Sequence, residues 1–132
     1  MSRPSFLHRL VHEPAWRPRW AVLWAGLMFF VAVAALSPGD AAPTLTPSDK
    51  LNHLLAFAAL AAAGSLALRD RWHAALLVAG SMVAYGGFIE LAQTQIPGRF
   101  ADGADLLADG LGVALGLGTV HLLRRLWRDE IR

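Results

Sequence analysis

The sequence predicts an all-α membrane protein, a bundle of four transmembrane helices that forms a single domain over residues 1–132. Hydrophobic residues make up 55% of the chain and charged residues only 17%, which is more apolar surface than so small a soluble protein can bury. Four apolar stretches each approach the ~20 residues that a helix needs to cross a bilayer. Basic residues gather in alternate flanks of these stretches, as they do in multi-pass proteins.

The apolar stretches run over about residues 20–36, 51–68, 74–95 and 106–123. Helices are expected because a membrane span must satisfy its own backbone hydrogen bonds, and the alternation of barrel strands is missing. Ser37-Pro38-Gly39 ends the first helix and Pro97-Gly98 ends the third. An alternative is that the first 40 or so residues are a cleaved signal peptide. The length of the apolar run and its aromatic residues favour retention.

Two acid-containing segments indicate helix starts. Thr46 is the expected N-cap of the second helix, with Pro47 at the first helical position and Asp49 at the third. Asp102 and Asp105 repeat this pattern before the fourth helix. These acids therefore have a structural role available as caps.

The distribution of basic residues predicts the orientation. Ten of the twelve Lys and Arg residues fall on one side of a four-span topology: Arg3, Arg9, Arg17, Arg19, Arg69, Arg71, Arg124, Arg125, Arg128 and Arg132. Only Lys50 and Arg99 fall on the other side. The positive-inside rule therefore places both termini in the cytoplasm. Topology explains the basic flanks, so no nucleic-acid partner is expected.

Polar side chains gather at the opposite, extracytoplasmic end of the predicted bundle: Lys50, His53, Glu90, Gln93, Arg99, Asp105 and Asp109. His53, Glu90 and Asp109 lie six or seven residues inside their helix ends, at a common depth of roughly 9–10 Å. Each shares a helical stripe with small or aromatic residues, and Gly112-x-x-x-Gly116 marks close helix contact. The polar groups are therefore expected to meet in a pocket inside the bundle.

Several chemistries are compatible with this pocket, and the sequence leaves open whether the protein is an enzyme. Glu90 and His53 are candidate general base and acid. The remaining polar residues are candidate substrate-binding groups, with cations for phosphate or carboxylate and acids for amines. A divalent-metal site of His53, Glu90 and an acid of the fourth helix is a less favoured alternative, because no His-x-x-x-His or Glu-x-x-His pattern joins these residues. No metal ligands are therefore assigned, and no cofactor is predicted. The chain has no Cys, which excludes thiol catalysis and Cys-ligated zinc.

The motif residues resemble the VanZ-like family. They are Leu36-Ser37-Pro38, Ser48-Asp49-Lys50-Leu51-Asn52-His53, Phe57, Glu90-Leu91-Ala92-Gln93, Pro97-Gly98-Arg99, Asp102 to Asp105 and Ala108-Asp109-Gly110-Leu111-Gly112. The resemblance covers about residues 36–118, and Asp109 stands where the family has asparagine at least as often. It implies a bacterial cytoplasmic-membrane protein that acts on an envelope amphiphile, in a family associated with resistance to the glycopeptide teicoplanin.

Two hypotheses of different classes follow. The first is a protein that binds or modifies a lipid- or glycan-linked polar group of the envelope, with membrane lipids or a lipid-linked precursor as partner. The second is a non-catalytic scaffold or assembly factor whose polar cluster only locks the helices. A transporter is less favoured, since one short bundle has no inverted repeat for alternating access. A homo-oligomer is compatible with either hypothesis.

Overall fold

The computed structural model describes residues 5–38 and 41–128, and every regular element in these ranges is helical. The order is α1 (Phe6–His12), a 3-10 turn (Pro14–Trp16), α2 (Arg17–Ala35), α3 (Asp49–Ala67), α4 (Trp72–Gln93) and α5 (Gly103–Arg128). Four of these segments are long and apolar enough to cross a membrane. The predicted all-α fold with four spans is therefore confirmed. Arg3, Gly39 and Arg132, used in the sequence predictions, lie outside the described residues.

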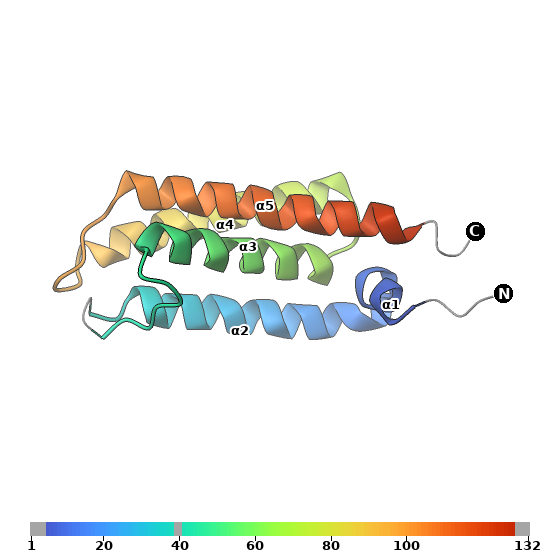
Figure 1. Cartoon of the computed structure of the whole chain (residues 1–132), viewed down its shortest axis with the longest axis horizontal. Helices are drawn as coiled ribbons and strands as arrows, with labels where there is room; N and C mark the ends of the chain where they lie inside the picture. The colour runs from blue at the N-terminus through green and yellow to red at the C-terminus, as the bar shows by residue number, and fades with distance from the viewer. Residues whose placement is uncertain (1–4, 39–40, 129–132) are drawn as a thin grey trace.

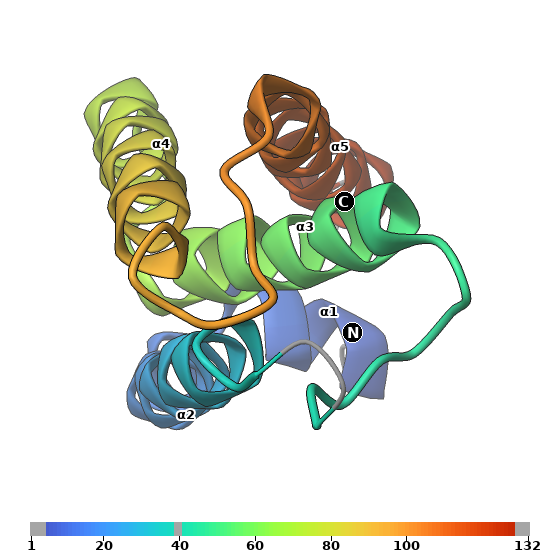
Figure 2. The same cartoon turned by 90° about the vertical axis from the view of Figure 1, so that its left-hand side faces the viewer.

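The four long helices run side by side along the long axis of the molecule (Figure 1). Helix α1 and the end of α5 lie at one end, and the segments that follow α2 and α4 lie at the other. Helix α3 is central, with α2 on one side and α4 and α5 on the other (Figure 2). It packs most extensively against α5 and then against α2. Which end faces the cytoplasm stays a prediction.

The buried core is small and the outer faces of the helices are apolar. Phe57 and Leu60 of α3, Met82 and Ile89 of α4 and Val113 of α5 are almost inaccessible. Large apolar side chains cover the outer surface of α2, α4 and α5, and α2 buries none of its residues completely. Apolar surface of this extent is incompatible with a soluble monomer and matches contact with lipid.

Two glycines of α5 allow it to lie directly against the backbone of α3. A Cβ atom at Gly112 would collide with the carbonyl oxygen of Leu54, and one at Gly116 with that of Ala58. The predicted close contact at Gly112-x-x-x-Gly116 is therefore present, and its partner is α3. Small residues at this spacing let membrane helices approach closely and pack by van der Waals contact.

The start of α3 differs from the prediction. Ser48 is the N-cap, its hydroxyl accepting a hydrogen bond from the Leu51 amide, and the helix begins at Asp49. Thr46 is engaged instead by Asn52, whose side chain accepts from the Thr46 amide at 2.8 Å and donates to its carbonyl at 3.0 Å. This exchange holds Thr46 and Pro47 outside the helix.

The basic end of the bundle contains structure that the hydropathy pattern did not predict. Helix α1 was not expected, and α5 continues to Arg128 although the apolar stretch ends near residue 123. Arg124 sustains the extension by donating to the Ser65 carbonyl at 2.8 Å and to the Asp70 carboxylate at 3.0 Å. Trp20 of α2 donates to the Leu10 carbonyl at 3.0 Å, which docks α1 on α2.

Candidate functional site

The most deeply buried ionic contact joins α3 to α5. His53 Nδ1 and Asp109 Oδ1 are 2.9 Å apart, and their side chains are only 10% and 2% exposed. When Asp109 is ionised its carboxylate only accepts hydrogen bonds, so Nδ1 is then the donor and Nε2 is the ring nitrogen that this contact leaves open. The other carboxylate oxygen, Oδ2, has no hydrogen-bond partner in the described chain. It faces Gly86 of α4, where an added Cβ would lie 2.7 Å away.

A second set of charges lies at the start of α5. Lys50 Nζ is 2.9 Å from Asp102 Oδ2 and 3.4 Å from Asp105 Oδ1. Asp105 is buried, whereas Lys50 and Asp102 are exposed. The hydrogen bond from Lys50 lowers the pKa of Asp102 from its ordinary value, and the bond from the Ala104 amide adds to this effect. Because the folded pKa is lowered, the stabilisation is present above the unfolded pKa and is lost as pH falls through the folded pKa.

We expect the carboxylate of Asp102 to titrate at lower pH in the wild type than in Lys50→Met, because the ammonium group stabilises its charged form. Carbon-13 NMR of labelled aspartate in lipid nanodiscs measures the two midpoints. Lys50→Arg keeps a positive charge at this position and is the control, in which the Asp102 midpoint is expected to stay below that of Lys50→Met. If the titration midpoint of Asp102 is the same in the wild type and in Lys50→Met, Lys50 does not form the contact with Asp102.

Glu90 caps α5 from the neighbouring helix. Its Oε2 atom accepts from the Asp102 amide at 2.9 Å, while Asp102 Oδ1 accepts from the Ala104 amide at 2.8 Å. Asp102 is thus the N-cap of α5, as predicted, but the reciprocal acceptor comes from α4 and not from Asp105. Glu90 lies inside α4, so its capping role serves another helix and not its own. Glu90 Oε1 is buried without a hydrogen bond in the described chain.

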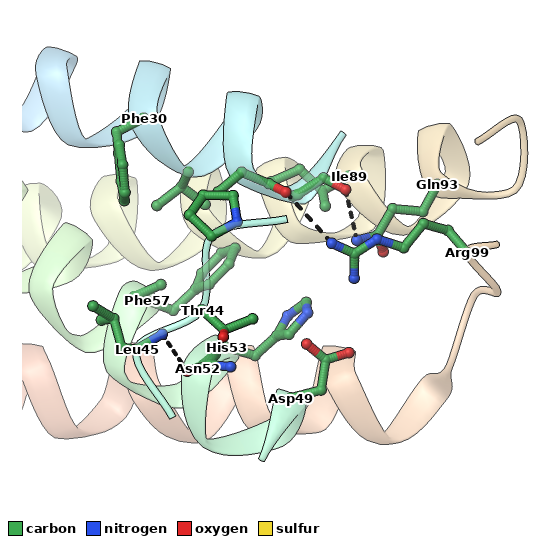
Figure 3. A pocket seen from close by; sticks show the side chains of 15 residues that line it. Phe30, Thr44, Leu45, Asp49, Asn52, His53, Phe57, Ile89, Gln93 and Arg99 are labelled. Atoms are coloured by element: carbon green, nitrogen blue, oxygen red, sulfur yellow. Dashed lines mark hydrogen bonds between the residues drawn. The ribbon is translucent and has the colours of Figure 1, made fainter. Parts of the chain in front are cut away.

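Gln93 and Arg99 hold the end of α2. Gln93 donates to the Ala35 carbonyl at 3.1 Å, and Arg99 donates to the carbonyls of Ser37 at 3.3 Å and Ala34 at 3.4 Å (Figure 3). The Ala34 and Ala35 carbonyls belong to the last turn of α2, and Ser37 lies just beyond it. Carbonyls at a helix end lack their full set of intrahelical partners, so side-chain donors can bind them. Both side chains therefore have a structural role in addition to any contact with a ligand.

A cavity of about 90 Å³ opens between α2, the segment before α3, and α3 itself. Its apolar lining includes Phe30 and Val31 of α2, Phe57 of α3 and Ile89 of α4. Its polar lining residues are Thr44, Asp49, Asn52, His53, Gln93 and Arg99. Asp49 and His53 lie on one side and Gln93 and Arg99 on the other (Figure 3). We call this cavity the α2–α3 pocket. It combines an apolar wall with an acid, an imidazole and a guanidinium.

The structure divides the predicted site residues into two groups. His53, Gln93 and Arg99 line the α2–α3 pocket. The other four are not in its lining: Lys50, Asp105 and Asp109 make ionic contacts, and Glu90 accepts a hydrogen bond from the Asp102 amide. Their functional roles stay predictions.

Sequence reasoning missed two pocket residues. Asn52 was named only as part of the family motif, and Asp49 was interpreted as a cap. Asp49 precedes His53 by four residues and so occupies the same face of α3, a signal that was available in the sequence.

One group of side chains has the composition of a metal site. Asp49, His53 and Asp105 each offer one ligand atom, and these atoms lie within 4.8 Å of one another. Imidazole and carboxylate together are ligands for divalent transition metals. No metal ligands were assigned from the sequence because no His-x-x-x-His or Glu-x-x-His pattern joins the polar cluster, and the Asp49-x-x-x-His53 spacing differs from both patterns.

Comparison with known proteins gives one result. A protein-family model described as VanZ/LLP1 matches residues 16–124, which include most of all four long helices. No curated protein and no solved structure matches.

Proposed function

The chain belongs to the VanZ/LLP1 family, and from this premise we propose that it binds a lipid- or glycan-linked polar group at the extracytoplasmic face of a bacterial cytoplasmic membrane. We further propose that this binding contributes to teicoplanin resistance, as the family resemblance implies. The protein is a multi-pass membrane protein by its four apolar helices and its family.

The composition of the α2–α3 pocket supports this proposal. An amphiphile needs an apolar surface for its chain and polar partners for its head group, and the pocket offers both within one cavity. Arg99 can pair with a phosphate or carboxylate of the ligand, and Asp49 with an amine. A cavity of about 90 Å³ is small, so it accommodates part of a head group and not a whole lipid.

The position of α2 supports access from the membrane. Helix α2 forms one wall of the pocket and has no completely buried residue, so one side of the pocket is separated from lipid by a single helix. The segment of residues 43–45 covers another side. A lipid-linked ligand can therefore approach laterally and leave its apolar portion in the bilayer.

Binding is better supported than catalysis. Glu90, the candidate general base, does not line the pocket, and one of its oxygens is occupied by the Asp102 amide. His53 is hydrogen-bonded to Asp109 and not to Glu90. A proton-transfer group must reach the ligand within hydrogen-bond distance, and only His53 of this pair faces the pocket.

Teicoplanin susceptibility of a sensitive Gram-positive host tests the proposal. We expect the wild type to raise the inhibitory concentration several-fold and Asp49→Asn to abolish most of that protection. Loss of one charge-assisted contact, worth about 1.5–3 kcal/mol, weakens binding roughly tenfold or more. Asp70→Asn, an exposed acid at the other end of the bundle, is the matched control and is expected to protect. Membrane levels of each variant are measured in parallel.

Glu90→Gln separates binding from catalysis in the same assay. Glutamine keeps an oxygen for the Asp102 amide, so a binding protein retains protection, whereas an enzyme that needs Glu90 as a base loses it. If Asp49→Asn protects as well as the wild type, the α2–α3 pocket is not the binding site. If an abundant wild type gives no protection, the link to teicoplanin is wrong.

The helix contacts favour a scaffold as the second candidate. Glu90, Gln93 and Arg99 each bind the backbone of a neighbouring helix or its flanking segment. In a scaffold, the polar cluster acts only through these hydrogen bonds, which hold the helices together. Asp49 then has no role beyond its place in the first turn of α3, and Asp49→Asn is expected to leave every phenotype unchanged.

A further inference from the structure

We propose that Asp49, His53 and Asp105 bind a divalent transition-metal ion at the polar side of the α2–α3 pocket, and that Asp109 is the positioning residue for His53. The inference deepens the proposed function and rests on it in one respect, since the ion would engage the head group of the ligand. Zn²⁺ is the probe by which the site is tested.

The three ligand atoms are close enough to share one ion after a small adjustment. They lie within 4.8 Å of one another, whereas tetrahedral zinc with bonds of ~2.0–2.2 Å needs ligand atoms about 3.3–3.5 Å apart. Asp49 is exposed at the first position of α3, so its side chain can rotate inward. His53 and Asp105 are already fixed in the packed interface between α3 and α5.

The contact between His53 and Asp109 orients the imidazole for metal binding. Metal-binding histidines donate their second ring nitrogen to a carboxylate or carbonyl, which fixes the tautomer and makes the coordinating nitrogen more basic. The 2.9 Å contact with Asp109 engages Nδ1 and leaves Nε2 available. Gly86 makes room for the Asp109 carboxylate by lacking a Cβ atom. The buried Asp109 thus contacts His53, and His53 lies close to Asp49 and Asp105.

The charge balance of this end of the bundle favours a bound cation. Five described carboxylates gather here: Asp49, Glu90, Asp102, Asp105 and Asp109. The permanent cations among the described residues at this end are Lys50 and Arg99, and Arg99 is hydrogen-bonded to carbonyls. Glu90 Oε1 and Asp109 Oδ2 are buried without hydrogen bonds. Excess negative charge near the membrane is costly, and a divalent ion would offset it.

Lys50 is a competitor and not a substitute for the ion. Its ammonium group makes a closer contact with exposed Asp102, at 2.9 Å, than with buried Asp105, at 3.4 Å. The Asp105 contact involves Oδ1, so Oδ2 can serve an ion without displacement of Lys50. Three protein ligands would leave one zinc position open. An oxygen of a phosphate or carboxylate head group could occupy that position, beside Arg99.

Direct metal binding tests the site without any amphiphile. The full chain, stripped with a chelator and placed in phosphatidylcholine nanodiscs, is dialysed against Zn²⁺, and bound zinc is measured by elemental analysis. Co²⁺ absorption reports the coordination geometry. We expect one ion per chain, and affinity at least tenfold weaker in Asp49→Asn, His53→Gln and Asp105→Asn. Asp109→Asn is expected to weaken binding about 10–100-fold and to alter the Co²⁺ spectrum.

Matched controls separate this site from general attraction of cations. Asp102→Asn removes an acid at the same end that is not a proposed ligand, and we expect unchanged zinc binding. The reference chain and all variants carry His12→Gln, because the rings of His8 and His12 are stacked 4.7 Å apart at the other end and could bind zinc themselves. Millimolar Mg²⁺ is expected not to compete, since it prefers octahedral oxygen ligands.

Three outcomes would overturn the inference: no zinc bound by the wild type, zinc affinity lowered as much by Asp102→Asn as by Asp105→Asn, or zinc affinity unchanged in Asp49→Asn. Asp49 is exposed, so Asp49→Asn remains informative even if a buried variant fails to fold. Teicoplanin protection without zinc binding would refute the metal site alone. Zinc binding without protection would refute the link to teicoplanin and leave the metal site standing.

Discussion

His53→Leu is expected to lower the free energy of unfolding by about 3–5 kcal/mol, because it leaves Asp109 buried without its partner. The carboxylate cannot turn to solvent, since α3 and α4 enclose it. Adding Asp109→Asn to this variant is expected to recover much of the loss, because a neutral amide costs less to bury than an unpaired charge. The measurement is reversible unfolding in mixed micelles with a chelator present, so that a bound ion does not contribute.

His73→Leu is the matched control for this experiment. His73 is exposed near the start of α4 and has no hydrogen bond or ion pair in the described chain. Its replacement is expected to change stability by no more than about 0.5 kcal/mol, as surface substitutions do. If His53→Leu costs no more than His73→Leu, the contact between His53 and Asp109 does not hold α3 against α5.

Gly116→Ala is expected to destabilise the bundle by about 1–3 kcal/mol, the usual cost of overpacking a close contact. The added methyl group would collide with the Ala58 carbonyl, a backbone atom that cannot move aside as a flexible side chain can. Helices α3 and α5 must therefore separate, and van der Waals contact is lost along their whole interface. The same unfolding measurement detects this effect.

Gly118 provides the comparison, two residues further along the same helix. No atom lies within 4 Å of a Cβ placed there. Alanine is a better helix former than glycine, so Gly118→Ala is expected to be neutral or stabilising by up to ~1 kcal/mol. Equal effects of the two substitutions would show that α5 does not approach α3 at Gly116 as closely as described.

Most of the fold could be predicted from the sequence because a membrane span is determined by length, hydropathy and the charge of its flanks. Helix α1 could not be predicted in this way. It has only seven residues, too few to be stable alone, and it depends on contacts with α5 and on the hydrogen bond from Trp20. The extension of α5 was missed for a related reason, since Arg124 is stabilised by partners on other segments.

The polar cluster was predictable in outline but its pairing was not. Helix arithmetic placed His53 and Asp109 at one depth, and the structure brings them within hydrogen-bond distance. Which acid meets which base depends on the rotation of each helix about its axis, and residue spacing does not determine that rotation. Glu90 shows the difficulty most clearly, because its hydrogen-bond partner is the backbone of another segment and carries no signal in the sequence.

The attachment of α2 has a consequence for how this sequence can change over evolutionary time. Tyr85, Gln93 and Arg99 bind α2 through the carbonyls of Met28, Ala34, Ala35 and Ser37. Every residue type has a backbone carbonyl. These hydrogen bonds therefore persist when the side chains of Met28, Ala34, Ala35 or Ser37 are substituted. Selection can therefore act on the length and placement of α2 while its apolar residues drift, and constraint falls on the three donors in α4 and the turn that follows it.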